Sequence, residues 1–509
     1  MSRKLSRSHD GGSITRRRFL AAASAGIGAA AIAPQRVGHA AESRWDQTTD
    51  VLVVGLGGAG ACAALEARVN DAEVLVLEAS AAPGGSTAMS AGEIYLGAGT
   101  PTQRALGYED TADAMYDYLM ASCGPGMDTE KTRRYVDESV SHHAWLASQG
   151  VTFNDTFWPE HHDAPGDQGL RWSGSENAHP FSATISPAPR GHKVAAVGFA
   201  GGELMRILTD RVKKSGAGIH TSSRCLRLIA DGENRVVGAV ANMEGAEKRI
   251  RARRGVVITT GGFIQNREML AHHAPHLLPC TPLGAVSDDG SGIQMGIGLG
   301  AASLHMDAAF VGFMVHPPEA MIEGIFVNQY GQRYINEDAY LGRVGHYSMT
   351  RADGDALLIL DAGIEGEPFE LAGLEKIGSA QSVEELERKT QIPSPALQHC
   401  LSFYNQYAKE GRDPLFGKHS EFLRPLDQMP LRAYRYQVGK SFVPAFTLGG
   451  LWTQPTGEVR KVDGSTIPGL YAAGRATSGV PARGYSGGSS IGDVTFFGRI
   501  AGRSAALNT

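Results

Sequence analysis

A glycine-rich turn between an apolar run and a helical pattern constrains this 509-residue chain more than any other feature. Residues 50–54 predict a buried parallel strand, and residues 61–69 predict a helix. Between them, Gly55, Gly57 and Gly60 have the spacing G-x-G-x-x-G. Such glycines permit a tight turn, a close backbone approach to a pyrophosphate and tight helix–strand packing. The segment therefore predicts a Rossmann-like α/β domain that binds a dinucleotide.

The sequence after this turn continues the same pattern. Residues 73–77 predict a second strand that ends at Glu78, whose carboxylate can accept a hydrogen bond from a ribose hydroxyl. A second loop rich in glycine and hydroxyl groups follows directly, in residues 83–87 and 90–92. Both features favour a bound nucleotide.

Three later segments, one in the middle of the chain and two near its end, decide between NAD and FAD. Residues 255–263 and 468–474 each predict a buried strand that ends in glycine, and a glycine-rich loop at 484–492 precedes a last helix. An extended FAD needs contacts from both chain ends, whereas an NAD site needs only the first half. We therefore predict FAD, held noncovalently. The predicted contacts are Gly55, Gly57, Gly58, Ala59, Gly60, Glu78, Gly84, Gly85, Ser86, Thr87, Ser90, Ala91, Gly92, Thr260, Gly261, Gly474, Arg475, Ser489, Ser490 and Ile491.

The first forty-one residues resemble a twin-arginine export signal. Arg16, Arg17 and Arg18 precede Phe19 and a mildly apolar run that is too short to span a bilayer, which takes about 20 residues. Small residues at 38–41 suit cleavage. The expected partner is the twin-arginine translocase, which carries folded proteins to the periplasm, and no stable membrane span is expected after cleavage.

Charge and cysteine content exclude several classes. The first 41 residues hold seven of the 48 basic residues and one of the 53 acids, so cleavage leaves 41 against 52, a net charge of −11. Such an acidic protein is a poor nucleic-acid binder, and the basic run at 248–254 is expected to be a solvated approach to a strand. The five cysteines form no C-x-x-C, and the paired histidines lack ligand spacing, so no metal site is predicted.

The four glycine-containing motifs, at residues 55–60, 83–92, 255–263 and 468–492, occur in an order that resembles the flavoproteins grouped with fumarate reductase and succinate dehydrogenase. This group includes urocanate reductase and the 3-ketosteroid dehydrogenases. The resemblance covers nearly all of the chain after the signal. It implies an FAD-binding domain in two segments, 42–272 and 440–509, with an inserted α+β catalytic cap at 273–439. One departure is Arg475, because many relatives have Glu after the final Ala-Ala-Gly.

The substrate class follows from residues at the family's motif positions. Fumarate reductases bind their substrate carboxylates with a histidine and arginines, but here the matching stretches read Ala445-Phe446 and Tyr485, and Arg343 lies out of register. A buried dianion needs fixed cations. We therefore expect an apolar pocket with a neutral hydrogen-bond donor.

The resemblance to 3-ketosteroid dehydrogenases assigns roles to two tyrosines. Tyr340, beside the cap's Asn-Glu motif, matches the base that removes an α-proton while a β-hydride goes to flavin N5. Tyr485 matches the tyrosine that binds the 3-keto oxygen, assisted by a backbone N–H near Gly488 or Ser489. Ionising a tyrosine at pH 7 costs roughly 4 kcal/mol, so the base needs help. Arg343 is a candidate helper if its segment is helical.

The sequence thus predicts an exported FAD enzyme that desaturates a 3-ketosteroid or a similar cyclic ketone and passes electrons to an unknown acceptor. Within this resemblance, the 1-dehydrogenases usually carry prolines in the last glycine-rich loop, and this chain has none after residue 482. The resemblance is therefore slightly nearer to the 4-dehydrogenases of 5α-steroids. An enoate reductase of the fumarate or urocanate type and a flavin electron carrier without substrate chemistry are two further hypotheses.

The export signal can be tested directly. Changing Arg16, Arg17 and Arg18 together to Lys keeps the charge, but it removes the arginine pair that the translocase reads. The protein should then stay in the cytoplasm, folded and yellow, as measured by fractionation and flavin absorbance. Arg36→Lys, outside the motif, is the control. Unchanged periplasmic recovery of the triple variant would remove the assignment.

Overall fold

The computed structural model describes residues 44–508, and from Trp45 onward the chain forms one compact unit. The predicted twin-arginine signal, residues 1–41, lies outside the described residues. Within residues 44–508, every helix is too short or too polar to cross a membrane. The described chain is a mixed α/β structure, as the sequence predicts.

A mostly parallel sheet carries the glycine-rich turn. Its strand order is β20-β21-β10-β1-β2-β7, and all neighbouring pairs are parallel except β20 with β21. The strands are β1 (Gln47–Val54), β2 (Val74–Leu77), β7 (Gly218–His220), β10 (Ala246–Ile258), β20 (Glu458–Arg460) and β21 (Thr466–Ala472). The sheet therefore joins both ends of the described chain, as an FAD site requires.

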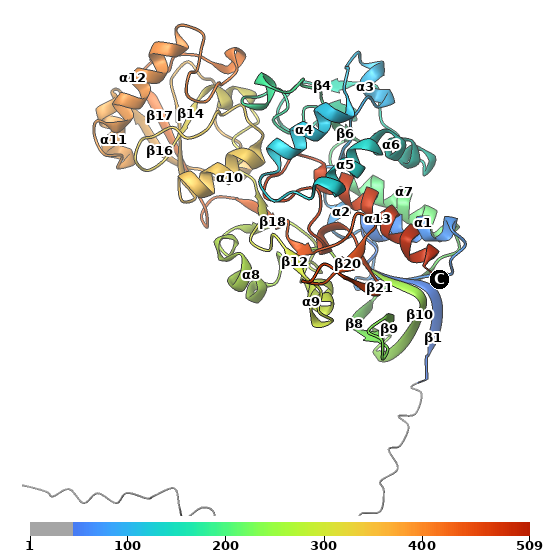
Figure 1. Ribbon diagram of the computed structural model, residues 1–509. Helices are drawn as coiled ribbons and strands as arrows, with labels where there is room; N and C mark the ends of the chain where they lie inside the picture. Colours follow the sequence, from blue (N-terminus) through green and yellow to red (C-terminus); the bar gives the residue numbers. More distant parts are fainter. Residues whose placement is uncertain (1–43, 509) are drawn as a thin grey trace, which may run out of the picture. The chain divides into compact units, whose positions relative to one another are not determined.

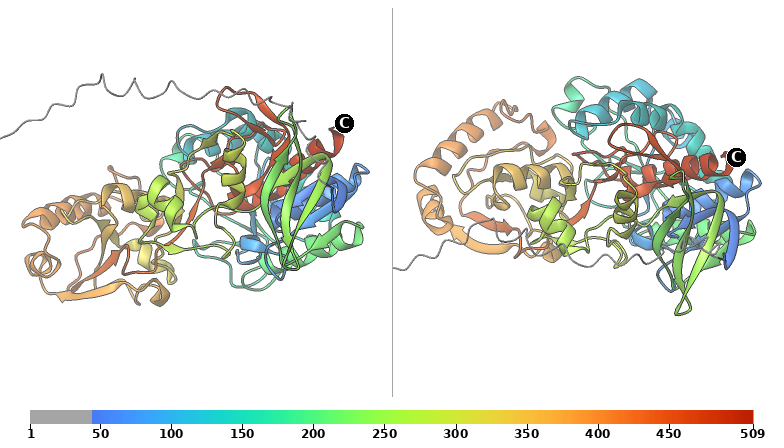
Figure 2. Two further views of the ribbon diagram at one scale, coloured as in Figure 1. Left: turned by 90° about the horizontal axis from the view of Figure 1, so that it is seen from below. Right: turned by 60° about the horizontal axis from the view of Figure 1, so that its bottom comes forward.

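Alternating side chains of β1 cover the two faces of this sheet. Val51 and Val53 pack with helices α1 (Gly58–Val69), α7 (Gly201–Lys214) and α13 (Ser489–Leu507), which lie side by side in Figure 1 and Figure 2. Leu52 and Val54 face the opposite core. On that side β8 (Ser223–Ala230) and β9 (Val236–Met243) form an antiparallel extension of β10. The basic run 248–254 thus lies within β10 itself, where it pairs with β9, rather than before a strand.

A second, antiparallel sheet lies within residues 325–437. Its order is β14-β15-β17-β16, and its strands are β14 (Ile325–Val327), β15 (Asp355–Leu360), β16 (Glu375–Ala380) and β17 (Leu431–Gln437). Helices α10 (Leu341–Arg351), α11 (Val383–Thr390) and α12 (Ala396–Ala408) accompany it. All of these elements fall inside the predicted cap, 273–439, whose boundaries stay predictions.

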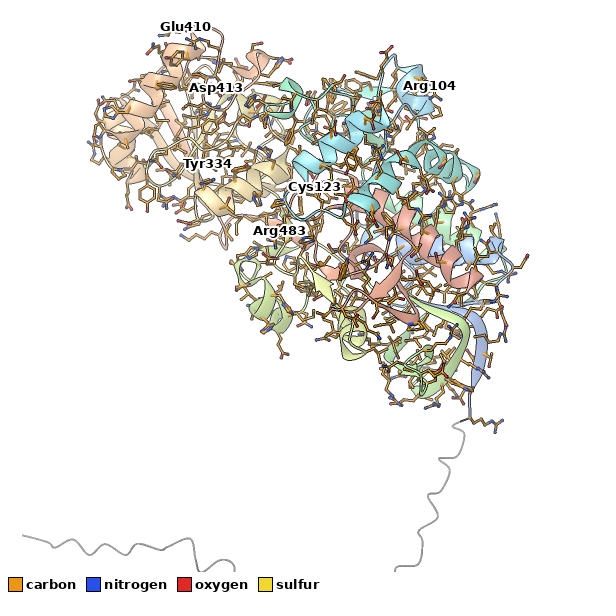
Figure 3. The ribbon with its side chains drawn as sticks, in the orientation of Figure 1. Arg104, Cys123, Tyr334, Glu410, Asp413 and Arg483 are labelled. Atoms are coloured by element: carbon orange, nitrogen blue, oxygen red, sulfur yellow. The ribbon has the colours of Figure 1, made fainter. Side chains whose placement is uncertain are left out.

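Buried ion pairs fix the Asn-Glu motif of the cap. Arg333 binds Glu337 and Asp413 at 2.7 Å each, and the Lys418 ammonium lies 3.3 Å from Glu337. Figure 3 marks Asp413 and, next to Arg333 in the chain, Tyr334. The motif therefore serves the structure of the cap and holds the start of α10, where Tyr340 lies.

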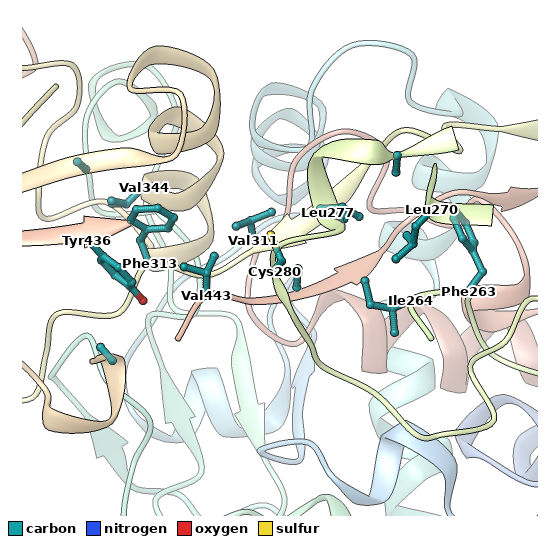
Figure 4. Close-up of a cluster of buried hydrophobic side chains, with 14 of the residues drawn as sticks. Phe263, Ile264, Leu270, Leu277, Cys280, Val311, Phe313, Val344, Tyr436 and Val443 are labelled. Carbon is teal, nitrogen blue, oxygen red and sulfur yellow. The ribbon is translucent and has the colours of Figure 1, made fainter. Parts of the chain in front are cut away.

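A continuous hydrophobic cluster connects this region with the parallel sheet. Figure 4 shows it running from Phe263 and Leu270 through Val311 to Phe313 and Tyr436. A small sheet crosses the same region, with β18 (Pro444–Thr447) between β11 (Thr281–Pro282) and β13 (Ala309–Val311). This packing places β18, with Phe446, between the two larger sheets.

The remaining elements are short. Strands β3-β6-β5-β4 form one sheet, and β12 pairs with β19. These strands are β3 (Glu93–Tyr95), β4 (Phe157–Trp158), β5 (Leu170–Arg171), β6 (Gly191–Lys193), β12 (Ser303–Leu304) and β19 (Gly450–Leu451). The other helices are α2 (Gly85–Ala88), α3 (Pro101–Ala105), α4 (Ala112–Ser122), α5 (Thr129–Asp137), α6 (Ser139–Ser148), α8 (Arg267–His273) and α9 (Ser291–Gly298).

The helix–strand contact at Gly60 should resist even a methyl group. A Cβ at Gly60 would lie 1.9 Å from the Gly55 carbonyl oxygen, so Gly60→Ala should lower the free energy of unfolding by about 1–3 kcal/mol or more. Gly298→Ala is the control, because it has no heavy atom within 4 Å of its Cβ and lies in a helix. Chemical denaturation of both purified variants would measure this. Equal stability would contradict the tight packing of α1 on β1.

Candidate active site

A cavity lies at the carboxyl ends of β1, β2, β10 and β21, where ligands of open α/β sheets bind. Many of the predicted cofactor residues line it: Gly55, Gly57, Gly58, Ala59, Glu78, Gly85, Ser86, Thr87, Thr260, Gly261, Gly474 and Arg475. Four chain segments that are distant in sequence therefore meet at one site, which is what an extended dinucleotide needs.

The glycines of the first turn differ in what surrounds them. Gly55 has φ +103°, and a Cβ there would lie 2.6 Å from the Thr259 carbonyl oxygen, so the turn requires glycine. A Cβ on Gly57 would meet only the Gly84 carbonyl oxygen, at 3.7 Å, and would enter the cavity. Gly57 thus keeps a space open beside the N-terminus of α1. The N-cap residue Gly57 has no capping side chain, and the Gly58 N–H donates to Thr87 Oγ1 at 3.2 Å, which leaves the next backbone N–H groups for a pyrophosphate.

The Glu78 carboxylate is buried and held in one orientation. Its oxygens accept hydrogen bonds from the backbone N–H groups of Leu56 and Ser80, each at 2.7 Å. A carboxylate has further lone pairs, so a ribose hydroxyl can still donate to it.

Arg475 forms an ion pair with Asp288, and Ser86 Oγ donates to the same carboxylate at 2.7 Å. All three line the cavity. The acidic pair Asp288-Asp289 precedes α9 and is typical of a helix start, but the Ser291 N–H at that start donates to Asp289 rather than to Asp288. Where many relatives have a glutamate, this chain therefore has an arginine with its own carboxylate partner.

Two buried donors of the cavity have no hydrogen-bond partner among residues 44–508. They are Thr260 Oγ1 and Arg475 Nη1. Together with the space at Gly57 they fit a bound FAD, which would supply the missing acceptors. The lining residues that no sequence motif marks come mainly from β8 and α9: Ser223, Arg224, Cys225, Ser287, Ser291 and Met295.

The other predicted cofactor residues shape the surroundings. Gly60 packs α1 on β1, and the Gly84 N–H donates to the Leu56 carbonyl. Ser90, Ala91 and Gly92 form a turn against the start of α7. Ser489, Ser490 and Ile491 begin α13.

The structure brings the two predicted catalytic tyrosines together. The ring centroids of Tyr340 and Tyr485 are 6.3 Å apart, and Phe310 and Phe446 complete an aromatic quartet. Phe446 also lies 5.3 Å from the Arg475 guanidinium carbon, which connects the quartet to the cavity. The sequence predicts Phe446 as pocket lining, whereas Phe310 carries no motif.

The Tyr485 hydroxyl lies at the N-terminus of α13. It accepts a hydrogen bond from the Ser490 N–H at 3.3 Å, which leaves its own proton free to donate. Of the two predicted backbone donors, Ser489 already donates its N–H to the Ser486 carbonyl. Gly488, with φ +75°, has no backbone acceptor for its N–H among the described residues. The loop is anchored where the Arg483 N–H donates to the Cys123 carbonyl (Figure 3).

Tyr340 precedes α10, and its N–H donates to Ser175 Oγ at 3.0 Å. Burial raises the pKa of Tyr340 well above its ordinary value, and it also raises the pKa of Tyr485. Arg343 is helical, as its helper role requires, but its guanidinium stacks on Phe181. The cation that lowers the pKa of Tyr340 is instead Arg171.

Tyr118 contacts residues next to both catalytic candidates, whereas its helical, apolar sequence pattern favours core packing over pocket lining. Its ring is buried, as that pattern predicts. Its hydroxyl also accepts a hydrogen bond from the Ser175 N–H at 2.7 Å and lies 3.0 Å from Ser486 Oγ. It therefore ties the segment before α10 to the loop before α13.

A metal site requires several ligating side chains close together. Within residues 44–508, no cluster of histidine, cysteine or carboxylate side chains is arranged to hold a metal ion.

Residues 50–491 match the family model described as FAD binding domain. The match covers most of the chain, so the chain belongs to this family of flavoproteins. FAD is its cofactor, and the chain is an FAD-dependent oxidoreductase, as the sequence predicts.

Individual relatives narrow the comparison. The 3-oxo-5-alpha-steroid 4-dehydrogenase of Comamonas testosteroni is 29% identical over 503 residues, which cover 86% of this chain and 94% of that protein. The structure of 3-ketosteroid-Δ4-(5α)-dehydrogenase from Rhodococcus jostii RHA1, in complex with 4-androstene-3,17-dione, is 42% identical with a TM-score of 0.86. That match covers 92% of this chain and 98% of the other. A flavocytochrome c3 fumarate reductase is 26% identical with a TM-score of 0.64, covering 91% and 79%.

Gly57→Val should remove FAD without unfolding the chain. Its side chain would enter an open part of the cavity rather than collide with backbone, and it would occupy the pyrophosphate space. We expect bound flavin to fall to about a tenth or less of the parental stoichiometry, measured by absorbance after denaturing release. Circular dichroism checks the fold. Stoichiometric FAD in this variant would show that the nucleotide site is misplaced.

Proposed function

We propose that this flavoprotein introduces a C=C bond next to the ketone of a 3-ketosteroid or a similar cyclic ketone. The observation that carries the proposal is the aromatic quartet, in which two tyrosine rings and two phenylalanine rings meet beside the cofactor cavity. An apolar, ring-shaped ketone suits such surroundings. The similarity to two steroid dehydrogenases supports the same substrate class.

A dicarboxylate substrate fits this site poorly. Two nearby guanidinium groups are engaged by carboxylates, because Arg171 binds Asp163 at 2.6 Å and Arg475 binds Asp288. Arg343 has no ion pair among the described residues, but its guanidinium stacks on the rings of Phe181 and Tyr347. Ala445 and Phe446 add no charge. A dianion needs two fixed cations to replace its hydration in a buried site, and the quartet itself offers none. The relation to fumarate reductases thus supports the fold and the cofactor more than the substrate.

The two tyrosines divide the chemistry. Tyr340 receives the proton that leaves the carbon next to the ketone, and Tyr485 donates a hydrogen bond to the ketone oxygen as that oxygen gains enolate charge. The Ser490 N–H polarises the Tyr485 hydroxyl and thereby strengthens this donation. When FAD is bound, its oxidised ring supplies the acceptor for the hydride from the β-carbon.

Ring position and location are further parts of the proposal. We favour the 4-dehydrogenation of 5α-3-ketosteroids, in keeping with the Comamonas and Rhodococcus relatives. The 1-dehydrogenase of Sterolibacterium denitrificans is 21% identical and supports the fold alone. The position of the new double bond, determined by NMR of the product, decides between them. Export to the periplasm through the twin-arginine route is also proposed.

Tyr340→Phe should slow flavin reduction while leaving substrate binding intact. The variant keeps the ring but loses the hydroxyl that accepts the proton, so the rate constant should fall by ~10² or more. Anaerobic rapid mixing with a saturated 5α-3-ketosteroid measures it. If the flavin is reduced at the parental rate, Tyr340 is a packing residue.

Tyr485→Phe should act mainly on the same step but also weaken ketone binding. Loss of one donor to developing oxyanion charge commonly costs about 10²–10³ in rate. The steroid-induced change in the flavin spectrum gives the affinity. Tyr436→Phe, a buried cap tyrosine that donates to the Phe442 carbonyl, is the control for loss of a hydroxyl. Equal effects of Tyr485→Phe and this control would contradict the assigned role.

A further inference from the structure

The proposed base, Tyr340, lies in surroundings that disfavour its negatively charged phenolate form. Both tyrosines are buried, and burial raises the pKa of each. Neither can rest as a phenolate near neutral pH, so a proton that reaches Tyr340 must displace the hydroxyl proton toward another group. A buried carboxylate that no motif marks, Glu93, lies behind the loop of Tyr485, and its charge acts on both tyrosines.

Glu93, on β3, lies directly behind the loop of Tyr485. The N–H of Tyr95, two residues along the same strand, donates to the Gly488 carbonyl at 3.1 Å. A Cβ at Gly487 would lie 3.4 Å from Glu93 Oε1, and a Cβ at Gly191 would lie only 2.1 Å from the same atom. Two glycines thus leave room for this carboxylate, which is 7% exposed.

The Glu93 carboxylate is only partly satisfied. Its Oε2 lies 3.5 Å from Arg171 Nη1, and its Oε1 makes no well-formed hydrogen bond among the described residues, although the Ser173 hydroxyl, which is itself without a partner there, is near enough to lower the pKa of Glu93. Arg171 is held more closely by Asp163 Oδ1, at 2.6 Å, and by the His161 carbonyl, at 2.8 Å. A merely structural ion pair would have both oxygens engaged. Here one oxygen is left to take up a proton.

Burial, adjusted by the surrounding charges, brings the pKa of Glu93 close to neutrality. Burial raises its pKa to about 7, Asp163 and Glu176 act in the same direction, and Arg171 and the Ser173 hydroxyl oppose them. Lys193 on the neighbouring β6 also interacts with its charge. In turn, the Glu93 charge acts on both Tyr340 and Tyr485.

We propose that Glu93 accepts the proton that substrate oxidation delivers to the tyrosine pair, an inference that rests on the proposed function. As the C–H bond next to the ketone breaks, its electron pair forms the enolate, and Tyr340 oxygen takes the proton. The original hydroxyl proton of Tyr340 passes to the Glu93 carboxylate, and the hydride of the β-carbon leaves to the oxidised flavin. Glu93 acts through Tyr340 and does not contact the substrate. It is therefore a positioning residue, which supports the proton acceptor, and not a catalytic residue.

Glu93→Gln tests this with a matched control. In the parental protein the rate constant of flavin reduction by a saturated 5α-3-ketosteroid should rise with pH through about 7, because only the ionised carboxylate accepts a proton. Glu93→Gln should lower it about 10-fold or more and remove this inflection, with FAD content and steroid affinity unchanged. Glu93→Asp keeps a carboxylate and should restore part of the rate constant and part of the pH inflection. A parental rate and inflection in Glu93→Gln would overturn the proposal.

Asp163→Asn gives a second, directional readout. It removes a negative charge near Glu93 and frees Arg171 to bind Glu93 more closely, so the inflection should persist but move to lower pH. An unmoved inflection would contradict the assignment to Glu93.

A measurement without substrate separates this proposal from the proposed function. Infrared difference spectra of the FAD-loaded parental protein, taken well below and well above pH 7, should show a buried carboxyl band that Glu93→Gln lacks. If no 3-ketosteroid reduces the flavin, the proposed function fails while this titration still reports on Glu93. If the band does not titrate, the role of Glu93 fails even where the steroid is oxidised.

Discussion

The contact between α1 and the carboxyl ends of β1 and β10 determines where every other part of the site lies. Gly60 allows the helix to approach the Gly55 carbonyl, and Gly55 turns the chain next to Thr259. This places an uncapped helix N-terminus at the edge of the parallel sheet. Because α13 packs on α1, its own N-terminus is fixed in the same frame, and with it the Tyr485 loop.

The pairing of buried charges then gives the site its chemical character. Asp288 engages Arg475, and Asp163 and Glu93 share Arg171, so these two cations carry partners of their own, while the Arg343 guanidinium stacks on Phe181 and Tyr347. A substrate with two carboxylates would have to compete for them. A ketone needs only a hydrogen bond, which strengthens as negative charge develops on its oxygen. The buried tyrosines, like a bound substrate, have few cations near them that could stabilise a negative charge. The proposed transfer of the proton to Glu93 would avoid such a charge on Tyr340.

Much of this organisation could be predicted from the sequence, because its signals are local. Glycine spacing predicts the cofactor turn, and the segments after β10 and β21 are visible as apolar runs ending in glycine. The meeting of Tyr340 and Tyr485 follows from resemblance alone, since nothing in their spacing brings them together.

Glu93, Arg171 and Phe310 escape prediction because each stands in a short strand without a motif. Their roles depend on long-range packing: β3 against the Gly488 loop, and β13 against β18. For Arg343 the helix that the sequence requires is present, but long-range packing places its guanidinium on Phe181 instead of beside Tyr340.

We propose that the site oxidises a neutral cyclic ketone rather than a dicarboxylate. Anaerobic titration of the FAD-loaded protein, followed at the flavin absorbance band, tests it most directly. A saturated 5α-3-ketosteroid should bleach the flavin in proportion to the amount added and yield a conjugated enone, while succinate leaves the spectrum unchanged. Bleaching by succinate, or no bleaching by any 3-ketosteroid, would contradict this claim.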